Sequence, residues 1–208
     1  IQMLTFPVSA IGWTASMTQR AVTSQRRINE FLHTGPGIKN EPEPVKPMLQ
    51  GNILFSHVDF VYPHTGIHAL KDFSLQVNKG EKIAIVGRTG SGKSTLAQLL
   101  LHMYEPQKGM ICFDGIPINR IDIQWLRLQV SYVPQDVFLF SETVSNNIRF
   151  GIDGATDELV RSAATQASIH NEIEKFSSGY RTMIGERGVT LSGGQKQRIS
   201  IARALIKD

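Results

Sequence analysis

Apolar residues recur at helical spacing through the start of the chain, and no charged side chain precedes Arg20. Ile28, Phe31 and Leu32 continue the helical period to about residue 33. Because residues three and four apart share one face of a helix, this pattern predicts a single helix over residues 1–33.

Two interpretations of this helix stay open. A complete membrane span needs about 20 apolar residues, and residues 1–17 fall short of that length. A sequence that starts inside the last membrane helix of a longer protein would show this pattern, with Arg20, Arg26 and Arg27 as its cytoplasmic flank. The other interpretation is an amphipathic helix of a soluble protein. A signal peptide is not indicated, because neither a basic start nor a cleavage site is visible.

The helical pattern stops at residue 34. Residues 35–37 read GPG and residues 41–47 read EPEPVKP, neither of which can hold a helix or a central strand. This composition predicts a proline-rich linker over residues 34–50. A second unit is expected over residues 51–208.

The second unit opens with strand patterns and then alternates strands with helices. Residues 73–77 alternate apolar with polar positions, as in a half-buried strand. Residues 83–86, IAIV, are wholly apolar, as in a strand buried on both faces. Further strands are expected over residues 53–55, 58–62, 110–113 and 130–133, and helices over residues 96–103 and 143–176. This order predicts an α/β fold that begins with β structure and carries an α-helical insert.

The glycine-rich segment at residues 87–94 reads GRTGSGKS and fits the phosphate-loop pattern G-x-x-x-x-G-K-[ST]. Glycines let the backbone curl so that its N–H groups face phosphate oxygens, and the positive end of the following helix adds to the field. Lys93 would supply a mobile charge for the β- and γ-phosphates, and Ser94 a hydroxyl for Mg²⁺. The alternative is a glycine-rich turn that meets the pattern by accident. The expected contacts with Mg-ATP are Gly87, Arg88, Thr89, Gly90, Ser91, Gly92, Lys93, Ser94 and Thr95.

Composition agrees with a folded protein, since 41% of the 208 residues are hydrophobic and 19% are charged. The one cysteine, Cys112, cannot form an internal disulfide, which suits a reducing compartment. The net charge of +4 comes from 22 basic and 18 acidic residues. These charges are scattered rather than gathered into a basic stripe, so we expect no nucleic-acid partner.

A second glycine-rich helix start lies at residues 191–195, which read LSGGQ. Ile199, Ala202 and Leu205 then mark the buried face of a helix. Alone, this segment would be an ordinary helix start. Together with the phosphate loop, the chain resembles the ATP-binding domain of ABC transporters, whose signature it matches letter for letter. In that family the signature contacts a nucleotide held by a partner chain, which implies the trans contacts Leu191, Ser192, Gly193, Gly194 and Gln195.

The resemblance assigns roles to two further residues. Tyr62 stands where the family places an aromatic side chain that stacks on adenine; the alternative is an aromatic packed in the core. Gln135, in the segment YVPQD at residues 132–136, matches the Q-loop and would contact Mg²⁺ or the attacking water. Its alternative is an ordinary loop amide. Gln135 and Lys93 are the implied catalytic residues, and Ser94 and Gln135 the implied Mg²⁺ ligands.

The exporter subtype is indicated by two segments. Residues 140–148 resemble the stretch after the Q-loop in exporters, and residues 185–188, GERG, are similar to the X-loop that touches the membrane domains. The resemblance implies a head-to-tail pair with a second ATP-binding domain, contact with transmembrane domains through the Q-loop and X-loop, and ATP-powered transport. It also implies a place on the cytoplasmic side of the cell membrane, reached through the N-terminal helix.

The implied fold is an α/β P-loop NTPase core of the ABC ATPase type. It carries an N-terminal antiparallel β subdomain and an α-helical insert at about residues 137–190. The implied organisation is the end of a transmembrane helix over residues 1–33, the linker over 34–50 and the ATP-binding domain over 51–208, incomplete at its C-terminus.

One part of the family pattern does not occur in the sequence. The family has a further apolar strand ending in Asp-Glu, whose Glu polarises the attacking water, and a switch histidine after it. Residues 110–114 have a similar shape, but Gly115 follows where Glu is needed, so we interpret Asp114 as part of an Asp-Gly turn. His170 and Glu172 precede the signature and are not accepted as switch histidine or base. The sequence thus shows no general base, and we expect a fragment that hydrolyses ATP poorly alone.

Three functions remain to be weighed. The first is the ATP-hydrolysing part of an exporter, and the second is a module that binds ATP and dimerises without turnover. The third is a soluble relative that works on chromosomes or ribosomes, against which the exporter-like segments and the apolar N-terminus argue.

Overall fold

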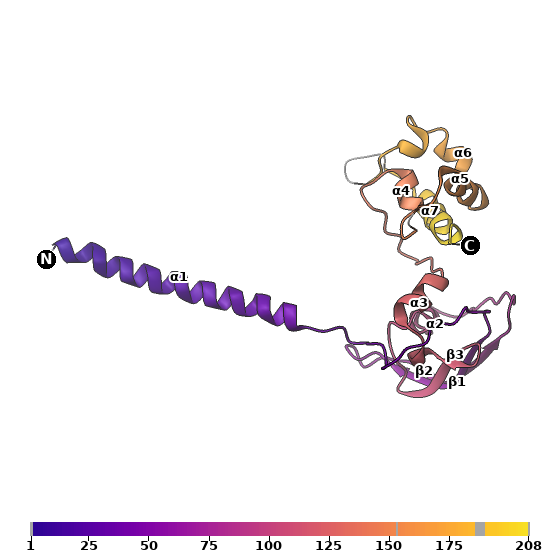
Figure 1. The fold of residues 1–208 in the computed structure, drawn as a ribbon, viewed down its shortest axis with the longest axis horizontal. Coiled ribbons are helices and arrows are strands. Elements are labelled where there is room, and N and C mark those ends of the chain that lie inside the picture. The colour runs from indigo at the N-terminus through magenta and orange to yellow at the C-terminus, as the bar shows by residue number, and fades with distance from the viewer. Residues whose placement is uncertain (1, 153, 186–189, 208) are drawn as a thin grey trace. The chain divides into compact units, whose positions relative to one another are not determined.

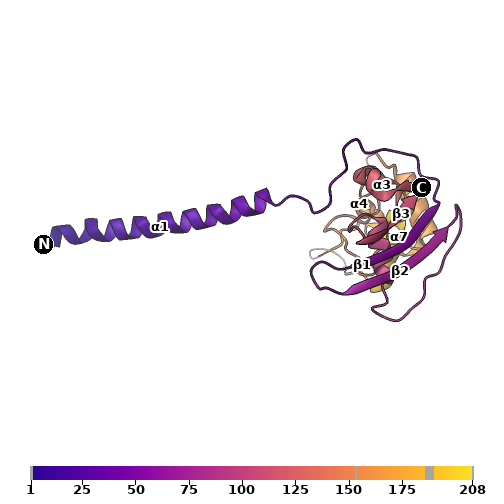
Figure 2. The same ribbon diagram turned by 90° about the horizontal axis from the view of Figure 1, so that it is seen from below.

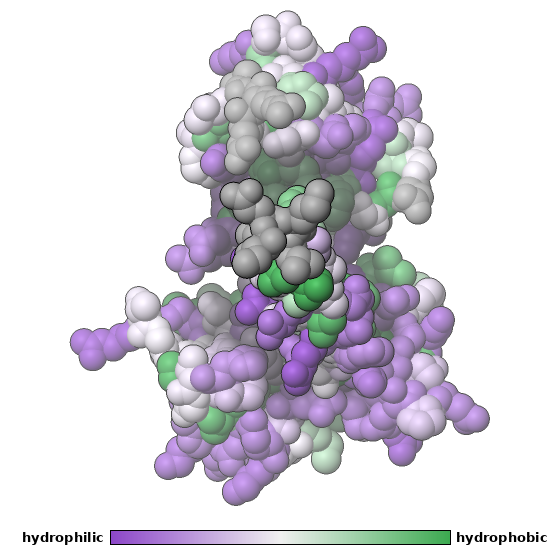
Figure 3. Space-filling model, turned by 90° about the vertical axis from the view of Figure 1, so that its left-hand side faces the viewer, coloured by the Kyte–Doolittle hydropathy of each residue, from purple (hydrophilic) through white to green (hydrophobic). Residues whose placement is uncertain are grey.

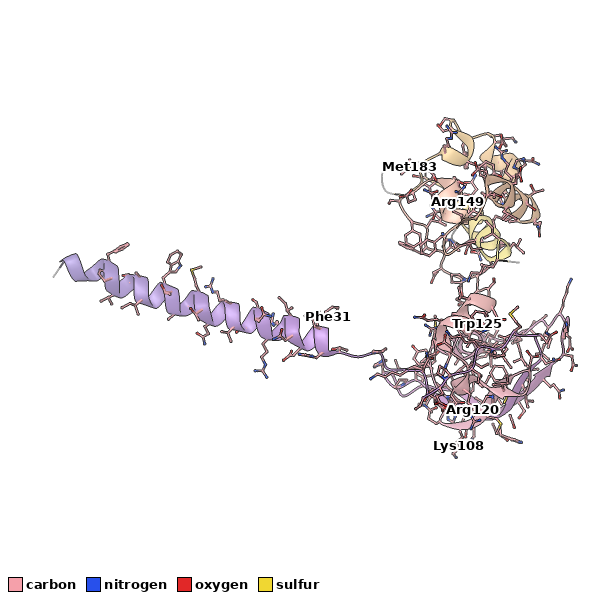
Figure 4. The ribbon with its side chains drawn as sticks, in the orientation of Figure 1. Phe31, Lys108, Arg120, Trp125, Arg149 and Met183 are labelled. Atoms are coloured by element: carbon pink, nitrogen blue, oxygen red, sulfur yellow. The ribbon has the colours of Figure 1, made fainter. Side chains whose placement is uncertain are left out.

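In the computed structural model, which describes residues 2–152, 154–185 and 190–207, the chain divides into two units. The first unit, Ile1–Lys39, is built on one long helix, α1 (Gln2–His33) (Figure 1). Its apolar side chains are exposed, among them Trp13 and Phe31, the latter near the C-terminal end of the helix (Figure 4). Within the described ranges, no helix combines the length and the apolar character needed to cross a bilayer.

The second unit, Asn40–Asp208, begins with an antiparallel sheet. Its strands follow the order β2-β1-β3-β4, and β1 and β2 run side by side in Figure 2. The alternating pattern at residues 73–77 is the C-terminal part of β2, where Phe73 and Leu75 lie against β1 and the core. The strands are β1 (Ile53–Val61), β2 (His68–Val77), β3 (Lys108–Phe113) and β4 (Ile116–Pro117).

Two helices cover this sheet, α2 (Lys93–Leu100) and α3 (Ile123–Gln129). Leu96 and Leu99, which the helical period assigned to one face, are both buried in the shared core. The short helix η1 (Ile118–Arg120) leads from the sheet toward α3. The fully buried members of this first core include Phe55, Val58, Phe60, Leu99, Ile121 and Leu126.

The rest of the second unit is helical and has a core of its own. Asn147, Ile169 and Ile199 are buried, and most residues on the face drawn in Figure 3 are hydrophilic. Threonine side chains cap α4 and α5, since Thr143 and Thr156 each accept a hydrogen bond from a backbone N–H of the first turn. The helices are α4 (Val144–Ile148), α5 (Asp157–Gln166), α6 (His170–Ile173), η2 (Gly179–Arg181) and α7 (Gly193–Leu205).

Two predicted strands are wrong. Residues 83–86 and 130–133 form no strand, and Ile83, Ile85 and Val86 are exposed, the last by 90%. A buried strand is held by backbone hydrogen bonds to neighbours on both sides and by helices on both faces. Among the described residues, no strand pairs with either segment, so apolar composition alone does not keep them extended. The sheet that does form is antiparallel throughout.

The proline-rich segment is divided between the two units, because the boundary falls after Lys39. Beyond it, the chain is fastened to α3. Asn40 and Asp122 share a hydrogen bond of 2.8 Å, and the Trp125 indole, labelled in Figure 4, donates to the carbonyl oxygen of Pro47 at 2.6 Å. The first bond joins two side chains, and the second satisfies the backbone carbonyl oxygen of Pro47. Residues 40–50 are therefore packed against α3 rather than a free tether.

Candidate functional site

The phosphate loop, residues 87–94, turns directly into α2. Gly90 and Gly92 both have a φ of +84°, in the left-handed region that favours glycine. A Cβ atom at Gly92 would lie 2.5 Å from the carbonyl oxygen of Ala69 in β2, whereas one at Gly90 would meet nothing within 4 Å. Gly92 is therefore required both by its backbone conformation and by the close approach of β2.

The Lys93 ammonium lies inside the curl of the loop. Its Nζ atom donates to the carbonyl oxygens of Gly87 and Arg88, at 2.7 Å each. The first N–H groups of a helix have no acceptor within the helix, and no side chain caps those of α2. A positive charge and uncapped helix donors at one place form an anion-receiving site. These residues fit a polyphosphate, and Ser94, exposed in the first turn, could offer its hydroxyl to Mg²⁺.

Tyr62 is tied to the helix that follows the phosphate loop. Its hydroxyl lies 2.9 Å from the Thr95 hydroxyl and donates to Gln98 Oε1 at 2.7 Å. The ring meets Phe60 and Tyr104 edge to face, with centroids 4.9 and 5.4 Å away. Thr95 is buried and its hydroxyl faces Tyr62. Its backbone N–H is therefore the group of Thr95 that could donate a hydrogen bond to a phosphate.

The signature turn, residues 191–195, has an anchored start and an exposed tip. Leu191 is buried in the helical core, while Ser192, Gly193 and Gly194 are exposed. Ser192 and Gln195 form a capping box: the serine Oγ accepts from the Gln195 N–H, and Gln195 Oε1 accepts from the Ser192 N–H at 2.9 Å. The N–H groups of Gly193 and Gly194 are left at the positive end of α7.

Two residues that the sequence did not assign hold this turn from the side. The Glu172 carboxylate of α6 accepts from Gln195 Nε2 at 3.1 Å and pairs with the Arg198 guanidinium. The contact joins segments more than twenty residues apart in the chain. No local pattern reports such a contact, which is why the sequence indicated only that Glu172 is not the base.

Gln135 is exposed in an irregular segment after α3. Nearby, the carbonyl oxygen of Pro134 accepts a long hydrogen bond of 3.5 Å from Gln197 of α7. Further along, the buried Asn147 accepts a hydrogen bond from the Phe140 N–H at 2.9 Å and one from Arg203 of α7 at 3.0 Å. The segment that follows Gln135 is thus fixed to the helix that carries the signature turn.

The acidic and histidine side chains that resemble catalytic groups in the sequence have other hydrogen-bond partners in the structure. Asp114 and Gly115, with φ of +51° and +79°, form the turn between β3 and β4, which confirms the Asp-Gly turn. The Asp114 side chain accepts hydrogen bonds from the N–H groups of Gln50 and Asn52. Burial alone would raise the pKa of this carboxyl, but the hydrogen bonds from Gln50 and Asn52 outweigh it and lower the pKa. His170 Nδ1 lies 2.7 Å from the Tyr180 hydroxyl. In the part of the chain that is described, no three histidine, cysteine or acidic side chains converge to hold a metal.

The expected site residues form two separate groups. Lys93, Gly87, Arg88 and Ser91 come together in the phosphate loop. No hydrogen bond joins them to Gln135 or to the signature turn within the described ranges. The expected X-loop residues Glu186, Arg187 and Gly188 lie outside the described residues. A cavity of about 740 Å³ is lined by Asn146, Arg161, Tyr180 and other residues of the helical part, and not by the phosphate loop.

A phosphate loop that opens a helix beside an antiparallel sheet, with a second glycine-rich helix start in a helical region, defines a P-loop nucleotide-binding protein. Residues 70–208, more than half of the chain, match the family model described as ABC transporter. The chain belongs to the ABC transporter family, and it is an ATP-binding domain of the exporter type.

Relatives cover nearly all of this chain. It is 45% identical over 98% of its length to the probable multidrug resistance ABC transporter ATP-binding/permease protein YheI of Bacillus subtilis, of which it covers 35%. It is 43% identical over 90% of its length to the human mitochondrial potassium channel ATP-binding subunit, of which it covers 26%. The chain therefore spans about a quarter to a third of the length of these relatives.

A solved structure agrees with the fold. The chain resembles a bacterial Atm1-family ABC exporter with ATP bound, with a TM-score of 0.85 and 36% identity. The match covers 91% of this chain and 33% of that one. At this identity the likeness extends to the family and not only to the fold.

Proposed function

We propose that this chain binds Mg-ATP at the phosphate loop and forms part of an exporter that uses ATP hydrolysis to move a substrate across a membrane. The observation that carries the proposal is the Lys93 ammonium, held 2.7 Å from two loop carbonyl oxygens at an uncapped helix start. In this arrangement Lys93 would exchange its carbonyl partners for β- and γ-phosphate oxygens, which are stronger acceptors because they are charged.

The remaining nucleotide contacts are assigned as follows. The Tyr62 ring would stack on adenine, and its hydroxyl bond to Thr95 would keep it in register with α2. Ser94 and Gln135 would hold Mg²⁺, which neutralises phosphate charge when bound. Gln135 would orient the attacking water.

The second half of the site would come from another copy of the domain or from a related one. We propose that two domains pair head to tail, so that the signature turn of each faces the γ-phosphate held by its partner. The exposed N–H groups of Gly193 and Gly194 support this arrangement, because they are donors at a helix N-terminus with no acceptor within the helix. Residues 1–33 would reach the membrane, and the Q-loop and X-loop would touch transmembrane domains.

The test is the substitution Lys93→Ala, measured with a fluorescent ATP analogue and Mg²⁺. Loss of a charge-assisted contact to phosphate should weaken binding by about 100-fold. Lys108→Ala is the matched control, because that lysine, labelled in Figure 4, is 79% exposed and pairs with Asp59 rather than with the loop. The control variant should bind like wild type. Equal affinity of Lys93→Ala and wild type would refute the assignment.

A further inference from the structure

Glu172 lies on a helix, α6, that is packed into the helical core. Ile169, the N-cap residue of α6, and Ile173, its last residue, are fully buried, and His170 of the same helix is hydrogen-bonded to Tyr180 at 2.7 Å. The Glu172 carboxylate itself is partly exposed and reaches the first turns of α7. A side chain held this way can transmit the position of α6 to the start of α7.

The contact fixes which way the Gln195 amide faces. A carboxylate only accepts hydrogen bonds, so Gln195 must present its Nε2 group to Glu172, at 3.1 Å. Its Oε1 atom then faces the Ser192 N–H, at 2.9 Å, and completes the capping box. A chain of contacts therefore runs from Glu172 through Gln195 to the residue that precedes the two signature glycines.

Charge balance makes this support compatible with an anion. An isolated carboxylate beside the N-terminus of α7 would compete with a phosphate for its positive end. Here the other oxygen of Glu172 pairs with Arg198, one turn further along α7. The pair has no net charge, so it can hold the turn without repelling the ligand.

We propose that Glu172 is a positioning residue for the signature turn: it orients the N–H groups of Gly193 and Gly194 toward the γ-phosphate of a nucleotide held by a second copy of the domain. The inference rests on the function proposed above. On this proposal the orientation of the signature turn depends on α6, and not on the signature sequence alone. Glu172 touches neither nucleotide nor water and acts through Gln195.

The experiment uses the full-length protein that carries this chain and the variant Glu172→Gln. Gln195 and Arg198 donate to different oxygens of Glu172. Glutamine keeps the size but replaces one of these oxygens by an NH₂ group, so one of the two donors, in its present place, faces another donor. Binding of the fluorescent ATP analogue, which reports the phosphate loop, should stay within about twofold of wild type. ATP-dependent pairing of the domains and the turnover number should each fall about tenfold, because a misplaced donor loses most of its effect.

Glu174→Gln is the matched control. It removes a neighbouring ion pair of the same kind, with Arg161 at 3.0 Å, that does not involve α7. This variant should pair and turn over like wild type, whereas Ser192→Arg, which blocks the turn itself, should bind nucleotide and fail to pair. If Glu172→Gln matches wild type in pairing and turnover, the inference is overturned.

Exchanging the two charges distinguishes an effect on the orientation of the signature turn from an effect on the stability of the fold. The double variant Glu172→Arg with Arg198→Glu restores an ion pair between α6 and α7, and with it the melting temperature, but presents donors to Gln195 Nε2. Turnover should therefore stay low, and its recovery in the swap would show that only the ion pair matters. If wild type itself binds no ATP, the proposed function fails instead, so the two failures are distinguishable.

Discussion

The phosphate loop and the signature turn are both glycine-rich starts of helices, yet they are built differently. The phosphate loop has positive φ angles at Gly90 and Gly92, no capping side chain, and a lysine folded into its curl. The signature turn has a complete capping box and is held by a buried leucine and by Glu172. The phosphate loop therefore supplies both the backbone donors and the positive charge of its site. The orientation of the signature turn is set by contacts with neighbouring residues.

This difference matches the two tasks proposed for them. A loop that envelops a triphosphate gains from many donors and a mobile cation, so it can leave its helix uncapped. A turn that contacts a nucleotide held by another chain gains from a fixed orientation. Such a turn does not surround the phosphates, so it cannot compensate for a displacement of its N–H groups. Three experiments test whether this contrast has a physical basis.

The largest effect is expected from Gly92→Ala. Its Cβ atom would collide with the Ala69 carbonyl oxygen as well as occupy a left-handed backbone, so the free energy of unfolding should fall by about 3 kcal/mol or more. Gly90→Ala has the same φ and open space, and should lose only about 1–2 kcal/mol. Urea denaturation measures both values, and equal losses would mean that β2 does not constrain the loop.

A smaller effect is expected from Ser192→Ala, which removes the cap of α7. The free energy of unfolding should fall by about 1 kcal/mol, and ATP-dependent pairing should weaken because the turn is less fixed. Thr156→Ala removes the cap of α5 in the same helical region and serves as control. It should cost a similar amount of stability and leave pairing unchanged; weaker pairing in this control as well would show that pairing follows general stability.

The smallest effect is a pH dependence of stability that arises from the buried His102. This residue follows α2, the helix that begins at the phosphate loop. Burial lowers the pKa of His102 below its ordinary value of 6.5, and Glu105 offsets part of this shift. The folded state then binds this proton less readily than the unfolded state, so the contribution of His102 is complete above about pH 6.5 and decreases as the pH falls below it. The difference in unfolding free energy between wild type and His102→Asn should shrink from pH 7.5 to 5.5. A constant difference would contradict the prediction.

Much of the candidate site was predictable from short segments. The phosphate loop and the signature depend on glycines, a lysine and a serine at fixed local spacing, which is written in consecutive residues. The alternation at residues 73–77 likewise predicted a half-buried strand, which is part of β2. The packing of residues 40–50 was less predictable, because their hydrogen bonds go to α3 and not to their neighbours in sequence.

The sequence by itself determined where the chain can curl around an anion, since left-handed turns need glycine and phosphate needs donors and a cation at short range. Only the tertiary structure decided which apolar segments become strands and which charged side chains support the site. Residues 83–86 have the composition of a buried strand, yet Ile85 is exposed because a strand is stabilised by pairing and not by composition. Glu172 is not part of a local sequence motif. Its proposed role depends on its contact with the Gln195 amide of α7, which only the tertiary structure shows.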